Sequence, residues 1–511
     1  MKIKRSLPLL CVLTTLSLSA CNQKVVFISD SYVDVIVHSN RGTSVEYIDA
    51  SSLRYEYRLA TLEPKTLENR ALMPSTGSVS QLIIPVILPG YETIDLDGDG
   101  QDDKDKIQEN IAKTFFNQDC ENYQDSVFSF FKQSSFGGLN LGGLVTKWFN
   151  AGEICENIPQ NPNDFTKEDI FNIIQTAVDW VENTGYYLPK FDSNHDGYID
   201  SIWIVTSYKG ETNNENLETH SSWMNNPFFD TRDNLQKADE NSPVASVYGL
   251  TNYETFTSNK HPREIFHEIG HMMGLKDTSS SNGEYSPLGK LDIMGSLTGD
   301  FNSYHKMLLG WSKPYFAISS GKFRIHSHTN KHCTIAIPVD SLSMEKSEFN
   351  LFSEFILVDL YTNEGISKYD SVNIFTSSYL APNDIGVRIY YVNNPLFKIN
   401  LDNNFISLYK GDGLNTNERF FAPIENSNEN NIYNTKYQLS DKYTAWDEVR
   451  IIEKIGVDTF SNNGNINRQT FFRQGDIFEI SNYKAYFPNN TLLSGESFTS
   501  KIEISTIKDK R

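Results

Sequence analysis

Cysteine is scarce in this chain, with only five among 511 residues. No two of them have the C-x-x-C spacing of a thiolate zinc site, so a zinc site made from cysteines is not expected. Cys11 and Cys21 belong to an N-terminal segment that reads as a secretory signal, which leaves Cys120, Cys155 and Cys333. Three cysteines cannot all pair within one chain, so at least one is expected to be free. Cys120 and Cys155 flank one segment and could form a disulfide outside the cell.

Positive charge and long apolar runs are also in short supply. Lys and Arg number 45 against 65 Asp and Glu, which gives a formal net charge of −20. Nucleic-acid binding requires basic patches and is therefore not expected. Beyond the first twenty residues no apolar run is long enough for a membrane helix, and the strongest, 82–88, reads as a buried strand. Aromatic residues make up 13% of the chain, enough for folded cores.

The start of the chain has the pattern of a secretory signal. Three of the first five residues are Lys or Arg, and a short apolar run follows them. The run ends in Leu18-Ser19-Ala20-Cys21, which resembles the bacterial lipobox, where the cysteine becomes the lipid-bearing first residue. We expect residues 1–20 to be a lipoprotein signal peptide. Lipid on Cys21 would hold the mature protein at a membrane surface, in an extracytoplasmic location. A plain signal peptide is the alternative.

Apolar periodicity predicts an α+β organisation. We expect three helices, over residues 105–132, 166–184 and 262–274. Two buried strands are expected at 82–88 and 199–205. A glycine-rich turn is expected at 136–143. After Trp311 the pattern changes to alternating strands separated by Asn, Asp and Gly. This change indicates a mostly β C-terminal half. The predicted fold class is therefore a mixed sheet with helices, followed by a β-rich region.

The most informative stretch is HEIGHMMGLKD at 267–277. His267 and His271 are four residues apart, which places both imidazoles on one helical face, where they can bind one zinc ion. Glu268 lies one step round the helix. It can take a proton from the water that attacks a carbonyl and pass it to the leaving amine.

The residues after this core indicate a third ligand. Gly274 suits a left-handed turn that ends the helix, and the reversal brings Asp277 back toward the metal. Three protein ligands leave the fourth position open, as in catalytic zinc sites. The alternative is an ordinary amphipathic helix with two incidental histidines. A chance match to the five-residue core in a chain of this length is on the order of one in a hundred.

Several blocks together resemble the immune-inhibitor-A-like family of bacterial metallopeptidases. In chain order they are SSFGGLNL at 134–141, DSNHDGYID at 192–200, the zinc helix, DIMG at 292–295 and YHKMLLGW at 304–311. The resemblance covers about 80–315 and implies a zincin-like extracellular zinc endopeptidase with structural calcium. In the related metzincins a methionine turn lies beneath the ligands, and Met294 fits that place. Leu291 departs from the aromatic residue expected before this turn.

Two acidic loops are candidate calcium sites. One offers Asp192, Asn194, Asp196 and Asp200, and the other offers Asp95, Asp97 and Asp99. Neither has the bidentate Glu of an EF-hand at its twelfth position, where Trp203 and Lys106 stand. The alternative for each is a solvated turn.

An oxyanion formed during hydrolysis needs a hydrogen-bond donor. Tyr304 and His220 are the candidates. Each could equally be a structural residue with its own partner.

These features predict four parts. They are a signal peptide (1–20), a tether or short pro-segment (21–76), a zinc metallopeptidase domain (77–318) and a β-rich C-terminal domain (319–511). For the second part a short leading strand region is a further possibility, because residues 33–37 show some alternation of apolar and polar side chains. The predicted function is a surface-anchored zinc endopeptidase acting on proteins or peptides. A non-catalytic, calcium-dependent binding or adhesion lipoprotein is the alternative. Glu268 argues against it, because a binding protein needs no general base.

Overall fold

The computed structural model describes most of the chain beyond residue 30. The described residues are 31–39, 45–46, 72–120, 123–209, 214–224, 243–257, 262–279, 286–296, 299–329, 334–340, 354–370, 385–393, 397–400, 402–403, 405–408, 418–421, 448–462, 464–493 and 495–510. The expected signal peptide, Cys21 and Cys333 lie outside these ranges. The fold is mixed α and β, which confirms the α+β class. Within the described ranges no helix is long and apolar enough to cross a membrane.

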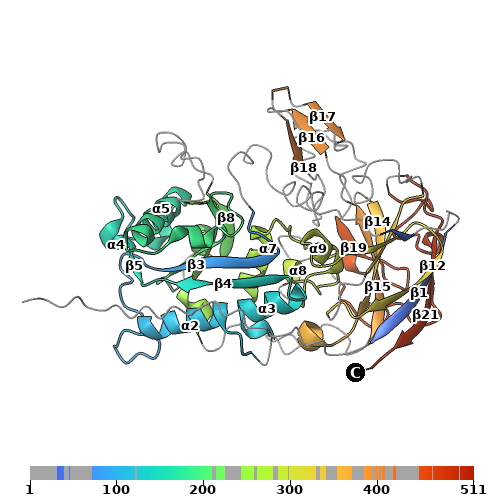
Figure 1. Ribbon diagram of the computed structural model, residues 1–511, viewed down its shortest axis with the longest axis horizontal. Helices are drawn as coiled ribbons and strands as arrows, with labels where there is room; N and C mark the ends of the chain where they lie inside the picture. Colours follow the sequence, from blue (N-terminus) through green and yellow to red (C-terminus); the bar gives the residue numbers. More distant parts are fainter. Residues whose placement is uncertain are drawn as a thin grey trace, which may run out of the picture.

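A six-stranded sheet forms the centre of the N-terminal half (Figure 1). Its order is β4 (Leu139–Val145), β3 (Gly77–Ile87), β7 (Ile202–Thr206), β10 (Val247–Asn252) and β8 (His220–Trp223), with β5 (Phe149–Asn150) also paired to β3. The strands are parallel except β8, which runs antiparallel to β10 at the edge. Both faces of the central strands are covered, so β7 reads as a continuous apolar run.

Pro85 lies within the central strand β3, where a missing N–H would normally break the ladder. On one side of β3 the pairing with β4 ends near Ile83, whose carbonyl accepts from Thr146 N. The pairing with β5 begins at Val86, opposite Phe149. Pro85 therefore falls between two partner strands, where no amide proton is required.

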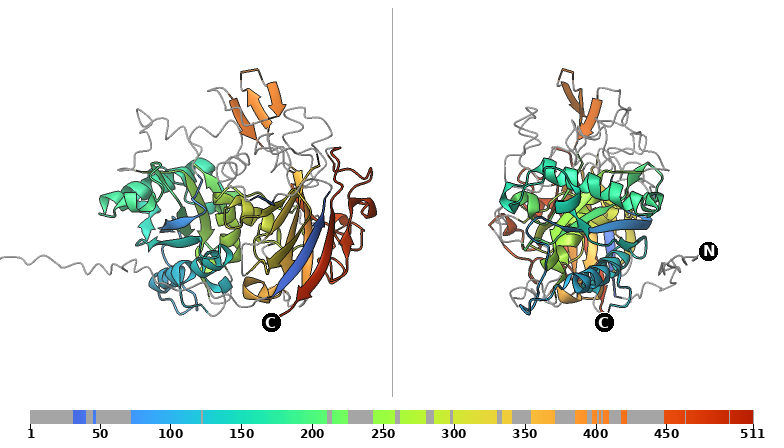
Figure 2. Two further views of the ribbon diagram at one scale, coloured as in Figure 1. Left: turned by 45° about the vertical axis from the view of Figure 1, so that its right-hand side comes forward. Right: turned by 90° about the vertical axis from the view of Figure 1, so that its left-hand side faces the viewer.

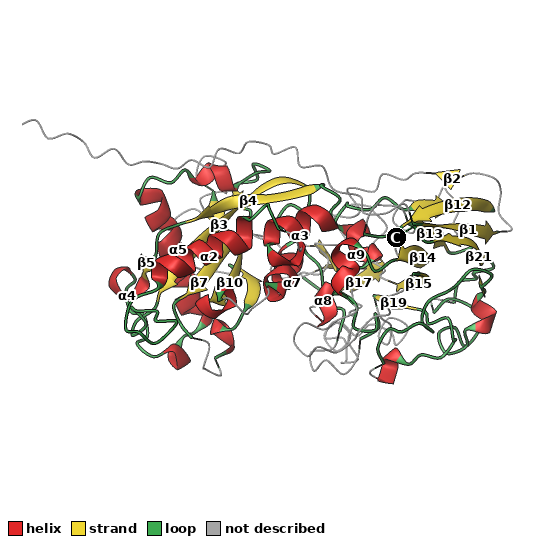
Figure 3. Cartoon of the chain, turned by 90° about the horizontal axis from the view of Figure 1, so that it is seen from below, coloured by secondary structure: helices red, strands yellow, loops and turns green. Residues whose placement is uncertain are grey.

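Helices cover both faces of this sheet: Figure 1 shows them above and below the strands, and Figure 3 looks from below onto the lower set. On one face lie α2 (Lys104–Phe116), α3 (Val127–Ser134) and α7 (Arg263–Met272), packed against Ile83 and Trp203. On the other lie α4 (Ala151–Ile154) and α5 (Lys167–Asn183), packed against Ile84 and Ile204. Alternate residues of each strand thus point to different helices. The short elements β6 (Tyr198–Ile199), β9 (Val244–Ala245), α8 (Ile293–Ser296) and α9 (Ser303–Leu308) complete this half.

The C-terminal half is built from β-strands, as expected. A six-stranded sheet has the order β19 (Val449–Ile451), β15 (Gly386–Asn393), β14 (Glu354–Tyr361), β13 (Ile335–Pro338), β11 (Tyr315–Ala317) and β2 (Val45–Glu46). A four-stranded sheet has the order β12 (Gly321–His326), β1 (Tyr32–His38), β21 (Lys501–Lys508) and β20 (Ile477–Phe478). A separate three-stranded sheet contains β17 (Phe405–Leu408), β16 (Phe397–Asn400) and β18 (Glu418–Phe421).

The six-stranded C-terminal sheet is buried on both faces. Ile356 and Val358 of β14 pack against the four-stranded sheet. Phe355 and Leu357 alternate with them along β14 and point to the opposite face, where they pack in the same core as Ile269 of α7. Every residue of β14 is buried for this reason. Near the expected boundary at 318 the chain therefore changes from a sheet covered by helices to a β-rich architecture. The hydrophobic core continues across this boundary.

Buried polar contacts also join the two halves. Arg388 of β15 makes a bidentate ion pair with Asp359 of β14, at 2.8 and 2.7 Å. Ser303, at the start of α9, donates to the same Asp359. A buried polar network of this kind is costly to break, because each group would lose its partners without gaining water.

Part of the N-terminal segment forms a strand, which is one of the three possibilities that the sequence left open. Residues 32–38 form β1, which lies between β12 and β21 and is antiparallel to both. Figure 2 shows this blue strand beside the red C-terminal strands. Val33, Val35 and Val37 point into the core and are fully buried. On the opposite face Asp34 pairs with Arg324 at 2.8 Å.

Two local expectations also need correction. The helix expected over 105–132 is two helices, because Ser126 caps a new helix by accepting from Ser129 N. Most of the expected glycine-rich turn is strand β4. A Cβ on Gly143 would lie 2.1 Å from the carbonyl oxygen of Gln81, so glycine is what lets β4 approach β3.

The disulfide that the sequence left open is not formed. Cys120 and Cys155 are both free thiols. Burial raises the pKa of the Cys155 thiol to about 11. A thiol with so high a pKa is a poor nucleophile at neutral pH.

Removal of β1 is expected to unfold the C-terminal half. A chain beginning at Asn40 loses three fully buried valines, worth about 5 to 9 kcal/mol of apolar burial, which is comparable with the whole stability of a domain. Thermal unfolding measured by circular dichroism should show no cooperative transition for this chain. A chain beginning at Ser31 is the control and should unfold as the longer protein does. Equal melting temperatures for both shortened chains would contradict the central position of β1.

Candidate functional site

Helix α7 carries the site between the sheet and the 292–295 turn. It begins directly after Pro262, and its buried face presents Ile265, Phe266, Ile269 and Met272 to the core. The helix ends at Gly274, which has a φ of +87°. Its N–H donates to the carbonyl of His271 at 2.7 Å. The positive φ is why glycine is required at this reversal.

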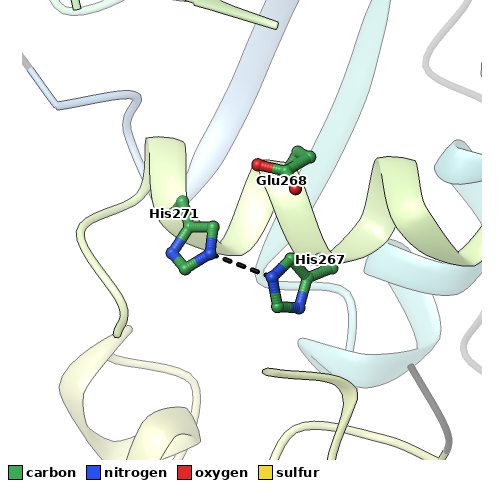
Figure 4. Close-up of side chains that lie close together, drawn as sticks. All are labelled: His267, Glu268 and His271. Atoms are coloured by element: carbon green, nitrogen blue, oxygen red, sulfur yellow. Dashed lines mark hydrogen bonds between the residues drawn. The ribbon is translucent and has the colours of Figure 1, made fainter. Parts of the chain in front are cut away.

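His267 and His271 lie side by side on the half-buried face of α7 (Figure 4). Their Nε2 atoms are 2.9 Å apart. Nδ1 of His267 is 3.0 Å from the carbonyl of Ile293, and Nδ1 of His271 is 2.8 Å from that of Leu275. A carbonyl can only accept, so each Nδ1 carries the proton. Each Nε2 is thereby left with the lone pair that a metal requires.

Asp277 completes a triangle of ligand atoms. Its Oδ1 is 3.1 Å from Nε2 of His267 and 3.3 Å from Nε2 of His271. Ligand atoms bound to tetrahedral zinc at about 2.0–2.1 Å are about 3.3 Å apart. The three atoms therefore have the size and the chemistry of a zinc ligand set. The side chain of Asp277 is 59% exposed, so the triangle borders solvent.

Charge is strongly coupled within the triangle. Loss of hydration raises the pKa of Asp277, but hydrogen bonds with His267 and His271 outweigh it and hold the pKa well below its ordinary range. Burial lowers the pKa of His271, but Asp277 beside it raises that pKa to about 9. Without a metal, a proton therefore lies between the carboxylate of Asp277 and the imidazole of His271. A metal cation can replace this proton.

Met294 packs against the helix. It is fully buried, and a Cβ on Gly270 would lie only 2.3 Å from its Sδ. The carbonyl of Met294 accepts from Thr278 N at 2.9 Å, next to Asp277. The preceding carbonyl, of Ile293, is the one that orients His267. The turn therefore contacts the helix, His267 and the neighbour of Asp277.

Asp292 holds this turn in place and was not singled out from the sequence. Its carboxylate accepts from Met294 N at 2.8 Å, from Thr278 Oγ1 at 3.1 Å, and from the backbone and side chain of Asn302 at 2.9 and 2.8 Å. Burial raises the pKa of Asp292 to about 6. The buried His305 lies 4.0 Å away, and burial lowers its pKa to about 3, which keeps its ring neutral.

Glu268 lies beside the two histidines, within 4.8 Å of their ligand nitrogens. Its Oε2 accepts from two donors of Ser221 in β8, the backbone N at 2.7 Å and the Oγ at 2.8 Å. Ser221 was not singled out from the sequence, since it precedes Glu268 by 47 residues. Only the pairing of β8 with β10 brings it to the helix.

Neither expected oxyanion donor points to this site. His220 pairs with Leu250, on the sheet face that α5 covers, and its Nδ1 contacts the carbonyl of Glu218 at 2.8 Å. Tyr304 is fully buried, and its hydroxyl donates to Glu448 at 3.3 Å. Both are structural residues here.

The segment 192–200 gathers carboxylates on either side of β6. Asp192 accepts from the backbone N of Asp196 at 3.1 Å and of Gly197 at 2.9 Å. Asp200 accepts from Ser193 N at 2.9 Å. Burial raises the pKa of Asp196, and it raises that of Asp200 to about 7. Among the described residues none of the three carboxylates forms an ion pair, so a cation would relieve their crowding.

The loop at 95–99 is similar but exposed. Asp95 accepts from the backbone N of Gly98 at 2.8 Å and of Gly100 at 2.9 Å. Carboxylate oxygens of Asp95, Asp97 and Asp99 lie within 4.8 Å of one another. Oxygen ligands at this spacing suit calcium.

Comparison with known proteins adds no family to this geometry. No protein-family model matches the chain, and no curated protein matches it. The function must therefore be argued from the site itself.

Gly270→Ala is expected to destabilise the protein although alanine normally favours a helix by about 1 kcal/mol over glycine. The added Cβ meets Met294 Sδ in a fully packed core, and overpacking of this kind costs about 1–3 kcal/mol. Chemical denaturation should therefore show a lower free energy of unfolding. Gly152→Ala in α4 is the control, because the nearest atom to its Cβ is 3.4 Å away. A stabilised Gly270→Ala protein would contradict this packing.

Proposed function

We propose that the chain is a zinc-dependent endopeptidase. The observation that carries the proposal is the triangle of His267 Nε2, His271 Nε2 and Asp277 Oδ1, with sides of 2.9 to 3.3 Å. A general base, Glu268, lies within 4.8 Å of the histidine nitrogens. A structural zinc site would be closed by a fourth protein ligand and would not need this carboxylate.

The surrounding fold supports a zincin-like domain. The helix with both histidines packs beneath a mixed sheet whose antiparallel edge strand, β8, borders the site. A buried methionine, Met294, lies under the helix. The motif resemblance to immune-inhibitor-A-like peptidases supports the same assignment.

The ligands and the base have separate tasks in hydrolysis. His267, His271 and Asp277 would hold a zinc ion, which would supply a Lewis acid to polarise the scissile carbonyl and to lower the pKa of water. Glu268 accepts a proton from the attacking water and returns it to the nitrogen of the leaving amine. The backbone carbonyls of Ile293 and Leu275 keep both imidazoles in the required tautomer and orientation.

The substrates proposed are proteins or peptides outside the cytoplasm. The signal-like start and the lipobox-like Leu18-Ser19-Ala20-Cys21 support a lipoprotein held at a membrane surface. The anchored chain would enter the fold through β1, so the C-terminal half would lie next to the anchor.

Glu268→Ala is expected to abolish cleavage while zinc stays bound. Loss of a general base lowers the rate at least about 100-fold, whereas Glu268 is not among the three ligands. The measurement is cleavage of casein and of an end-blocked fluorogenic peptide, together with zinc content by mass spectrometry. An end-blocked peptide also separates endopeptidase from exopeptidase action.

Two further variants serve as controls. Asp277→Ala should lose both zinc and activity, and Glu264→Ala, an exposed acidic residue of the same helix, should lose neither. Zinc at one per chain with no cleavage by the wild type would favour the binding or adhesion protein. Full activity after complete removal of zinc would contradict the mechanism.

Calcium is the second metal that we propose, in the loops at 192–200 and 95–99. The first loop holds buried Asp192 and Asp200 with no ion-pair partner among the described residues. Glycine at positive φ follows the acidic run in both loops, at Gly197 and Gly100. Calcium there would stabilise the loops against repulsion between their carboxylates.

Calcium at about one hundred times its dissociation constant is expected to raise the melting temperature by roughly 5–10 °C. Asp196→Asn and Asp97→Asn should each lose part of this rise, and the double variant should lose all of it. Magnesium at the same concentration is the control, because it prefers a smaller octahedral site. A melting temperature that does not respond to calcium would contradict both sites.

A further inference from the structure

The general base makes an unusual contact with the edge strand. Ser221 donates twice to Glu268, through its backbone N at 2.7 Å and its Oγ at 2.8 Å, and both donors meet the same oxygen, Oε2. A carboxylate oxygen offers about two lone-pair sites, so two donors occupy Oε2. Oε1 is then the oxygen left to exchange a proton.

The position of Ser221 in β8 explains why one residue can supply both donors. Ser221 pairs with Gly249 of β10, and along this antiparallel pair alternate residues turn their N–H groups away from the partner. The N–H of Ser221 reaches Glu268 and not β10. Its side chain lies on the α7 face of the sheet. Any residue except proline could offer the N–H, and the short hydroxyl side chain of Ser221 adds the second bond.

The base is thus held independently of the metal ligands. His267 and His271 are oriented by the carbonyls of Ile293 and Leu275, whereas Glu268 is oriented from the sheet. A free glutamate side chain loses about 1.5–2 kcal/mol of rotamer entropy when it is fixed, and hydrogen bonds made in advance offset this cost.

We propose that Ser221 is a positioning residue that holds Oε2 of Glu268 so that Oε1 acts as the base. This inference rests on the proposed peptidase function. An O–H bond of the attacking water breaks and its proton moves to Oε1. When the carbon–nitrogen bond breaks, the same proton passes to the amine nitrogen and Glu268 returns to a carboxylate. Ser221 keeps its own hydroxyl proton throughout.

The first test is Ser221→Ala, which removes the hydroxyl donor and leaves the backbone donor. We expect kcat to fall about tenfold, the loss typical of one hydrogen bond to a charged group, with KM, zinc content and melting temperature unchanged. Ser221→Thr keeps a hydroxyl and should recover most of the activity. Ser222→Ala is the control, because Ser222 lies opposite Tyr248 on the other face of the sheet and should leave kcat unchanged.

The second test needs no activity. In the metal-free protein, hydrogen exchange of the Ser221 amide should become at least about tenfold faster in Glu268→Ala, because its acceptor is lost. Glu264→Ala should leave the exchange rate unchanged. Exchange that Glu268→Ala does not alter would overturn the contact itself.

The outcomes separate this inference from the proposed function. Wild-type activity that requires Glu268 but survives Ser221→Ala at full kcat would overturn the positioning role and leave the peptidase assignment intact. A fall in kcat that Ser221→Thr does not recover would also overturn it, since the hydroxyl would not be the cause. A wild-type protein that cleaves nothing would overturn both.

Discussion

The hydrogen bond from His267 to the carbonyl of Ile293 is the constraint on which the site depends. It joins α7, which carries His267 and His271, to the separate turn at 292–295. The turn can hold the imidazole only because Asp292 fixes its backbone with a buried carboxylate that receives several donors. A buried charge satisfied in this way is rigid, because moving it would leave its donors unpaired. The same turn places Met294 under Gly270 and bonds Thr278 beside Asp277.

A second level of support comes from the C-terminal half. Its six-stranded sheet sends alternate side chains into two cores, one shared with α7 and one shared with the four-stranded sheet. The ion pair of Arg388 with Asp359, to which Ser303 also donates, ties that sheet to α9. The β-rich region is therefore part of the packing that supports α7. Its core strands can be understood without assigning them a separate binding role.

Local spacing carried most of what could be predicted about the site. The approach of His267, His271 and Asp277 follows from one helical turn and one glycine reversal, all within eleven residues of chain. Long-range pairing could not be read in the same way. The residue that hydrogen-bonds to Glu268 is Ser221. The sequence suggested its neighbour, His220, as the site residue in this strand. Because side chains alternate along a strand, these two adjacent residues lie on opposite faces of the sheet. For a related reason the sequence left the N-terminal segment open between a tether, a pro-segment and a leading strand, since nothing local reveals that a short apolar strand has partners at the other end of the chain.

The position of β1 has a consequence for how the molecule matures. Ser31 bonds to Lys510, although 479 residues separate them in the chain. Among the described strands β1 is made first and β21, one of its two neighbours, is made last, an interval on the order of tens of seconds at ordinary rates of synthesis. Contacts so distant in sequence form slowly, because closing a long loop costs entropy before any contact repays it. Until both neighbours of β1 are made, its valine face is exposed, and an exposed apolar strand favours misassembly and aggregation.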